Sequence, residues 1–121
     1  MLLTLLQAKI HNARVTGRHL DYHGSLTIDE DLIDAAGMRV GQQIQVYNSN
    51  NGIRFETYIL RGQRGSGEIQ VNGAAARLVE ENDRIIICTF AQLTPEEADT
   101  WEPHVVICDH GNQVVEEITY K

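Results

Sequence analysis

Short runs of alternating hydrophobic and polar residues, separated by turn residues, make up most of the chain. Such alternation is typical of half-buried β-strands. The run at 84–91 (RIIICTFA) is continuously apolar, which indicates a central strand. An Asn-Gly pair between two alternating runs predicts a hairpin. The expected strands are residues 9–16, 22–28, 43–48, 53–60, 67–72, 84–91 and 105–108.

Two short helices are expected among these strands. Asp29 precedes the sequence EDLIDAA and is expected to cap a helix that Gly37 ends. Thr94 followed by Pro95 predicts the start of a second helix. Acidic residues follow both caps, where they favour the helix dipole.

The remaining segments predict turns and a barrel. Residues 61–67 (RGQRGSG) are expected to form a loop, residues 73–76 a tight turn or single helical turn, and residues 114–121 a loosely held tail. Many short strands with turn residues every 8–12 positions or so predict a closed or nearly closed β-barrel. At 121 residues without a linker or repeat, the chain is expected to form one domain.

The charge distribution limits the classes of partner. The chain holds 17 acidic and 10 basic side chains, a formal charge of -7, which opposes binding to nucleic acid or anionic lipid. Residues 1–67 have a net charge of +1, and residues 68–121 a net charge of -8. Work on an anionic substrate is therefore expected of the first half. No apolar run reaches the ~18 residues of a membrane span, so no membrane segment is expected.

Cysteine and histidine spacing gives no signal for a metal. Cys88 and Cys108 lie in apolar runs without a CxxC pair, which predicts buried free thiols and a reducing cytoplasm. His19 and His23 are four residues apart, but in a strand-and-turn sequence that spacing does not bring them together. We expect no metal site. The arginines of 61–67 are expected to lie in a solvated turn rather than an anion-binding loop.

The pair Gly24-Ser25 is unusual inside a strand-like segment, because glycine weakens strands unless the backbone has a special task. One interpretation is a bulge with a locally bonded serine. The other is chemical: Ser25 attacks the carbonyl of Gly24, and the resulting ester eliminates to dehydroalanine and hydrolyses to a pyruvoyl group. The chain would then carry its own ketone as an electron sink.

At this point the sequence resembles the pyruvoyl-dependent aspartate 1-decarboxylases of pantothenate biosynthesis. The segment LDYHGSLTID (20–29) is similar to the family's processing site, NGIRFETY (51–58) to its substrate strand, and QVNGAAA (70–76) to its substrate turn. Residues 1–9 with His11, and residues 95–106, resemble its terminal parts. Four separated motifs in the same order extend the resemblance over nearly the whole chain.

The resemblance implies a mainly β fold, a double-psi β-barrel with short helices, assembled as a homotetramer. It implies self-cleavage into residues 1–24 and 25–121, and conversion of L-aspartate to β-alanine and CO2 for pantothenate and coenzyme A synthesis. The covalent pyruvoyl group from Ser25 would be the only cofactor. Whether an accessory maturation protein triggers the cleavage stays open.

The same resemblance implies roles for single residues. Ser25 becomes the pyruvoyl group that forms the Schiff base with substrate, Tyr58 donates a proton, and Arg54 with Lys9 holds a carboxylate. The substrate is further contacted by Thr57, Asn72, Gly73, Ala74 and Ala75, with His11, Tyr22, Tyr47 and Ile86 around the pocket. Two positions depart from the family pattern: Tyr47 replaces a frequent tryptophan, and Asn82 a glycine. Asparagine tolerates the left-handed turn expected there.

The chemistry assigns Arg54 to the side-chain carboxylate of aspartate, which stays in the product. Binding the carboxylate that is lost as CO2 would instead stabilise the ground state. Strict alternation puts Arg54 and Tyr58 on one face of their strand, about 13 Å apart at ~3.3 Å per residue, and Thr57 on the other. A site between subunits would accommodate this separation.

Two rivals remain. The first is a non-catalytic barrel that keeps the family fold as an interaction domain, which loss of Ser25, Arg54 or Tyr58 would favour. All three are present. The second is a DNA-binding regulator built from swapped hairpins, which the acidic charge opposes.

Overall fold

The computed structural model describes residues 1–120. Three helices and nine strands are formed in this part of the chain. The helices are α1 (Glu30–Ala36), the 3-10 helix η1 (Gly73–Leu78) and α2 (Pro95–Asp99). The strands are β1 (Leu3–Arg14), β2 (Gly17–His19), β3 (Ser25–Asp29), β4 (Gln43–Asn48), β5 (Arg54–Gly62), β6 (Ile69–Asn72), β7 (Arg84–Leu93), β8 (His104–Cys108) and β9 (Val114–Thr119).

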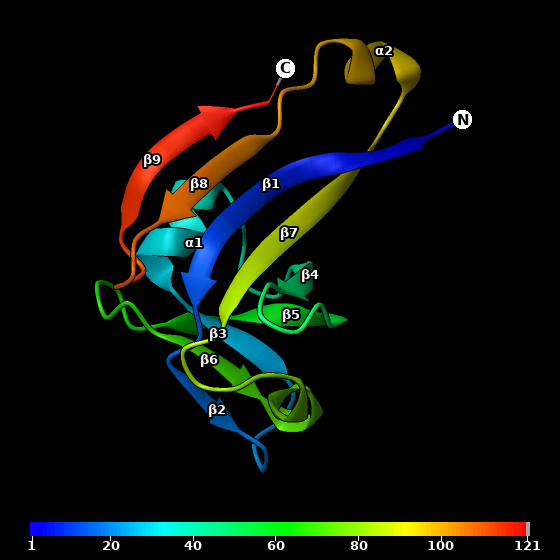
Figure 1. Cartoon of the computed structure of the whole chain (residues 1–121). Coiled ribbons are helices and arrows are strands. Elements are labelled where there is room, and N and C mark those ends of the chain that lie inside the picture. Colours follow the sequence, from blue (N-terminus) through cyan, green and yellow to red (C-terminus); the bar gives the residue numbers. More distant parts are fainter. Residues whose placement is uncertain (121) are drawn as a thin grey trace.

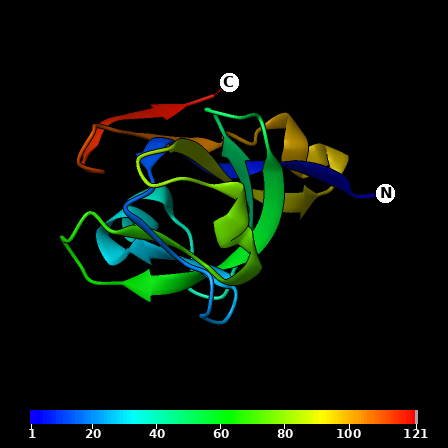
Figure 2. The same cartoon turned by 60° about the horizontal axis from the view of Figure 1, so that its bottom comes forward.

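The strands form one strongly curled sheet in the order β2-β6-β3-β5-β4-β7-β1-β8-β9. Figures 1 and 2 show the sheet wrapped around a single interior, with α1 beside β1 and β8. Three neighbouring pairs are parallel (β2 with β6, β3 with β5, β1 with β8), and the other five are antiparallel. The architecture is a double-psi β-barrel, as the family resemblance implies, and the strand pattern of the sequence correctly predicted a barrel.

The inward positions of these strands make the core. Ile10 on β1, Leu26 on β3, Ile59 on β5 and Ile87 on β7 are completely buried and belong to one hydrophobic cluster. Leu26 and Ile59 are register partners that both point inward. The residues before and after them in sequence therefore point to the outer face of the sheet. This alternation decides which side chains reach the outer surface of the barrel.

Local signals predicted several elements well. The strand at 43–48 is confirmed at both ends, and so are the caps of both helices. Asp29 accepts a hydrogen bond from Asp31 N, and Thr94 forms a capping box with Glu97. Residues 73–76 lie in η1, as one of the two expected forms.

Other boundaries were wrong. The strand expected from residue 22 begins only at Ser25, because residues 20–24 turn, with Tyr22 N donating to His19 O. The strand β5 extends to Gly62, two residues into the expected loop. Residues 114–119 are no loose tail but β9, paired antiparallel with β8. Most of β9 is exposed, so its backbone ladder with β8, rather than burial, holds it.

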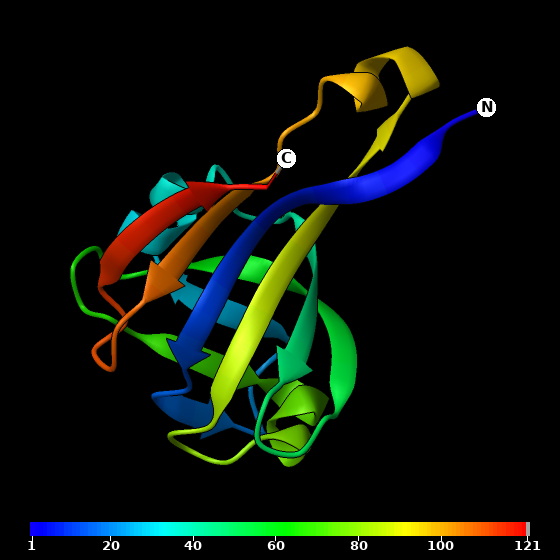
Figure 3. The ribbon, with the colours of Figure 1, turned by 45° about the horizontal axis from the view of Figure 1, so that its top comes forward.

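An arm projects from the barrel, formed by the start of β1, the end of β7 and α2 (Figure 3). Leu3 pairs with Leu93 at its tip, and Trp101 Nε1 donates to the carbonyl of Leu6 at 2.8 Å. The arm exposes large apolar side chains, including Leu2 and Phe90. Among the described residues, no helix has the length and apolar character to cross a membrane.

Candidate active site

Ser25 occupies a strained position at the first residue of β3. Its side chain is fully buried, and its φ of 134° lies in a region that residues with a side chain rarely adopt. Such backbone conformations cost about 1–3 kcal/mol and persist where the surrounding structure imposes them. The preceding Gly24 is exposed, and a Cβ built on it would meet nothing within 4 Å. The Gly24-Ser25 peptide therefore combines backbone strain at Ser25 with open space on the side-chain side of Gly24.

Asn72 holds the Ser25 hydroxyl. The two residues are register partners in the β3–β6 ladder, and Asn72 Nδ2 donates to Ser25 Oγ and to Thr27 Oγ1, each at 3.1 Å. Asn72 is itself buried at the junction of β6 and η1. Because Ser25 Oγ accepts this hydrogen bond, its own proton remains available for donation. The arrangement fixes the oxygen without using up its hydrogen.

Gly73 brings the start of η1 against the Gly24 backbone. Its φ is 72°, and a Cβ there would lie 2.8 Å from Gly24 Cα, 2.9 Å from Gly24 N and 3.1 Å from Tyr22 O. Only glycine permits both the conformation and this approach. Ala74 is exposed beyond it and Ala75 is half-buried.

Tyr58 lies beside Ser25 across the β3–β5 pair. Leu26 and Ile59 are register partners, and both side chains point into the core. The preceding residues, Ser25 and Tyr58, therefore both point to the opposite face of the sheet. The Tyr58 side chain is 43% exposed. Thr57 points to the opposite side, paired with the buried Ile44. The alternation that the sequence predicted for β5 is confirmed.

The carboxylate-binding candidates lie on the outward face of β1, β4, β5 and β7. Arg54 stacks over the ring of its register partner Tyr47, with Cζ 4.3 Å from the centroid. Tyr47 also pairs with the half-buried Ile86. Lys9 Nζ is 5.3 Å from the ring centroid of Tyr120. Arg54 lies four residues from Tyr58 along β5, and Lys9 lies three strands away, level with Glu56 in the register of the sheet.

Electrostatic effects mark the same face. The pKa of His11 is lowered, first by burial and then by the positive charges of Lys9 and Arg84. The Nδ1 atom of His11 is buried without a hydrogen-bond partner within residues 1–120. Burial raises the pKa of the Cys88 thiol, while the charges of Lys9 and Arg54 oppose that rise. Lys9, Arg54 and Arg84 thus place positive charge near these two side chains, although the whole chain is acidic.

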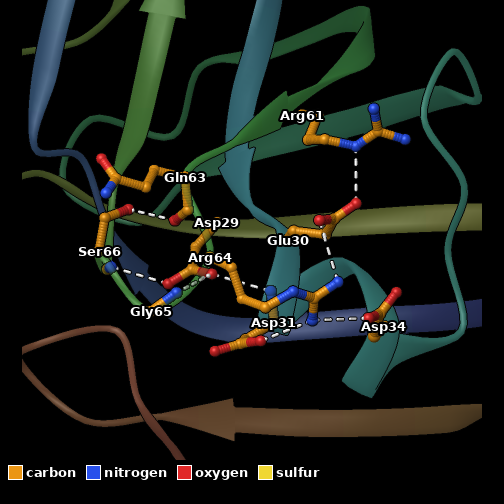
Figure 4. A network of polar contacts seen from close by, with 10 residues as sticks. Asp29, Glu30, Asp31, Asp34, Arg61, Gln63, Arg64, Gly65 and Ser66 are labelled. Atoms are coloured by element: carbon orange, nitrogen blue, oxygen red, sulfur yellow. Dashed lines mark hydrogen bonds and ion pairs between the residues drawn. The ribbon is translucent and has the colours of Figure 1, made fainter.

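Residues 63–66 form an exposed turn, as expected for this segment, and the two arginines at 61 and 64 pair with carboxylates of the same chain. Figure 4 shows Arg61 and Arg64 reaching the acidic side chains of α1. Arg61 Nε lies 2.6 Å from Glu30 Oε2, and Arg64 contacts Glu30, Asp31 and Asp34 at 2.7–3.0 Å. Both arginines are thus occupied by carboxylates of this chain. Their exposure limits the stabilisation of each pair to about 0–1 kcal/mol.

Two contributors escaped the sequence reasoning. Thr27 shares the amide of Asn72, and its spacing of two from Ser25 on a strand was the available signal. His19 stacks on Tyr22, with ring centroids 4.9 Å apart, and its Nε2 contacts Gln70 Oε1. This pair ties the turn before Gly24 to β6, and no local pattern announces it. Within the described chain, no three His, Cys, Asp or Glu side chains gather as a metal site.

A strained, glycine-preceded serine, held by Asn72 at the start of a strand in a small β-barrel, is the central feature of this site. A family model described as aspartate decarboxylase matches residues 1–115. The chain belongs to the aspartate decarboxylase family.

Relatives named aspartate 1-decarboxylase are similar over most of their length. That of Chloroherpeton thalassium is 56% identical over 113 residues, covering 93% of this chain and 83% of the relative. That of Ralstonia nicotianae is 53% identical over 112 residues, 93% of both chains. That of Bacillus licheniformis is 51% identical over 116 residues, 96% of this chain and 91% of the relative.

Proposed function

We propose that this chain is a self-processing lyase that converts L-aspartate to β-alanine and CO2 in pantothenate biosynthesis. Membership of the aspartate decarboxylase family supports the reaction. The observation that carries the mechanism is the Ser25 backbone, strained at φ 134° with Oγ held by Asn72. The buried unpaired cysteines fit a reducing compartment, and the proposal places the enzyme in the cytoplasm.

The chain first cleaves its own backbone at Gly24-Ser25. Ser25 Oγ attacks the Gly24 carbonyl carbon, the peptide C–N bond breaks, and the hydroxyl proton passes to the freed nitrogen, which leaves an ester. Loss of the Ser25 α-proton then expels the Gly24 carboxylate and leaves dehydroalanine. Water converts the resulting enamine to a ketone and releases ammonia. The products are residues 1–24 and a chain of residues 25–121 that begins with a pyruvoyl group.

The surroundings of Ser25 fit this group. Ser25 Oγ leaves with the Gly24 carboxylate in this reaction sequence, so the Asn72 amide that contacts it would become free to donate to an oxygen of the pyruvoyl group. The Gly24 and Gly73 backbones leave no side chain over the position. Once formed, the pyruvoyl group supplies an electron sink for the electron pair that CO2 leaves behind.

The other residues bind and protonate. Arg54 holds the side-chain carboxylate of aspartate through charge-assisted hydrogen bonds. Its stacking on Tyr47 restricts the orientation of the guanidinium. Lys9 adds positive charge on the same face. Tyr58, outward on β5 beside Ser25, donates the proton that replaces the lost carboxylate.

These residues assemble between subunits in our proposal. Arg54 and Tyr58 are four residues apart on β5, so their Cα atoms are about 13 Å apart at ~3.3 Å per residue, and Lys9 lies three strands from β5. A homotetramer would bring the Arg54 face of one subunit to the Ser25 end of another. The apolar arm of β1, β7 and α2 offers a surface for that assembly. The need for an accessory maturation protein is tested by comparing the cleavage rate of the chain in cells with that of the purified protein.

Replacing Arg54 with alanine is expected to lower kcat/KM for L-aspartate about 10- to 150-fold, the usual range for a charge-assisted hydrogen bond to a carboxylate. Steady-state kinetics on the cleaved enzyme measure this. Arg39→Ala, an exposed arginine outside the site, is the control. Unchanged kinetics would move the carboxylate contact to another cation. Arg14 would be tested next, because Arg61 is already paired with Glu30.

Replacing Gly73 with alanine is expected to slow self-cleavage and to lower the free energy of unfolding by about 1–3 kcal/mol, the range for a strained, overpacked position. Gly37→Ala is a matched control, because Gly37 has the same φ of 72° but open space around its Cβ position. Gly37→Ala introduces the same backbone strain, but its new methyl group does not contact Gly24. Equal cleavage rates of the two variants would show that the Gly73–Gly24 contact does not govern processing.

A further inference from the structure

A small basic hollow lies where β1 ends and β7 begins, side by side in Figure 3. Its volume is about 200 Å³. The decarboxylation mechanism uses none of its lining residues, none of which is acidic. They are Asn12, Arg14, Asn50, Asn82, Arg84 and His110.

The hollow contains two arginines that face each other. Arg14 and Arg84 are direct partners in the antiparallel β1–β7 ladder, so their side chains leave the same face. Like charges at directly opposite positions destabilise a sheet. Within residues 1–120, neither guanidinium has a carboxylate within 4 Å. In a chain of net charge -7, two adjacent cations without a counter-charge are unexpected.

The arginine pair is held in place by neutral acceptors. Arg14 Nε donates to the carbonyl of His110 at 2.6 Å, and its Nη1 donates to Asn82 Oδ1. Asn82 keeps the left-handed conformation expected from its sequence, with φ 75°. These bonds fix the guanidinium plane and leave Arg14 Nη2 without a partner in the described chain. Arg84 N donates to Asn50 Oδ1 at 2.8 Å, which fixes the second strand end.

Nearby carboxylates are committed elsewhere. Asp83 Oδ2 accepts from Asn48 Nδ2 at 2.8 Å and from Glu80 N at 2.9 Å. Asp109 Oδ1 accepts from two backbone amides of its own turn, at 2.9 and 3.0 Å. Neither side chain lines the hollow. The positive charge of the pair is therefore left for a ligand from solution.

We propose that this hollow binds a phosphate group. A phosphate dianion matches the charge of two guanidiniums, and its tetrahedral oxygens accept from several N–H forks at once. The volume admits one phosphoryl group, while any organic remainder would stay in solvent. Arg54, which holds the substrate carboxylate in our proposed function, does not line the hollow. The phosphate site is therefore separate from the aspartate site and does not depend on the proposed decarboxylation.

Isothermal titration calorimetry of the full-length protein with inorganic phosphate, and separately with glycerol 3-phosphate, tests the proposal. We expect binding that Arg84→Gln weakens about tenfold or more. Arg39→Gln removes the same charge elsewhere and is expected to leave affinity unchanged. Binding of inorganic phosphate alone would indicate the free ion as ligand, and preference for glycerol 3-phosphate a phosphate ester. Absence of binding by the wild type, or equal loss in both variants, would overturn the proposal.

Two further measurements separate this site from the active site. Thermal unfolding of Arg84→Gln is expected at or above the wild-type temperature, because the Arg84 guanidinium makes no hydrogen bond within residues 1–120 and its removal relieves repulsion from Arg14. Uncleaved Ser25→Ala is expected to bind phosphate with wild-type affinity, whatever the outcome for catalysis. Competition by L-aspartate at concentrations that saturate the enzyme would identify the hollow as part of the substrate site and overturn a separate phosphate site.

Discussion

The Ser25→Ala chain is expected to stay a single polypeptide of 121 residues and to release no CO2 from L-aspartate. Alanine lacks the oxygen that attacks the Gly24 carbonyl, so no ester, no cleavage and no ketone can form. Intact mass spectrometry of the purified protein follows cleavage, a hydrazine reagent detects the ketone, and labelled CO2 release measures turnover.

The control for this experiment is Ser49→Ala, which removes an exposed hydroxyl outside the proposed site. It is expected to cleave into residues 1–24 and 25–121 like the wild type. Circular dichroism and thermal unfolding establish that Ser25→Ala is folded. Decarboxylation by Ser25→Ala at the wild-type rate would eliminate the pyruvoyl mechanism and leave the family assignment untouched.

The Tyr58→Phe chain is expected to cleave itself normally and to form β-alanine about 10²- to 10⁴-fold more slowly, the usual contribution of a positioned general acid. Cleavage depends on Ser25 Oγ, Asn72 and the Gly24 carbonyl, none of which the phenol hydrogen-bonds within the described chain. Product formation differs, because carbon must be protonated before β-alanine leaves.

Single-turnover measurements on fully cleaved protein distinguish the steps. A normal burst of CO2 with slow formation of β-alanine places the defect at protonation. Tyr120→Phe removes a hydroxyl from another exposed tyrosine while keeping the ring under Lys9, and serves as the control. Equal product rates for wild type and Tyr58→Phe would assign Tyr58 to packing of the barrel wall and the proton to another donor.

The proposed active site was predictable from sequence only in part. Gly24-Ser25 is conspicuous locally, and resemblance to the family supplied roles for Arg54 and Tyr58. The faces of β5 also followed from alternation, since side chains of a strand point to opposite sides in turn. The backbone of Ser25 at φ 134° did not follow, because the strain is imposed by the β6 and η1 neighbours. The stacking of His19 on Tyr22 has no local signature for the same reason.

The sequence by itself determined those features that neighbouring residues encode. The strand 43–48, the caps Asp29 and Thr94, and the buried free thiols of Cys88 and Cys108 all follow from short patterns, and the structure confirms them. Periodicity and capping depend on residues a few positions apart, so they can be recognised in the sequence without the tertiary structure.

Tertiary structure decided which segments meet. The exposed β9 exists because the edge of β8 offers unpaired backbone groups, which composition did not reveal. Arg61 and Arg64 pair with carboxylates of α1, about thirty residues earlier in the sequence. Arg14 lies opposite Arg84, seventy residues later in the sequence. Strand register is fixed by the packing of the whole barrel, since a slip of one residue would turn every side chain to the other face. The contacts that shape the Ser25 site and the phosphate hollow therefore exist only in the folded chain.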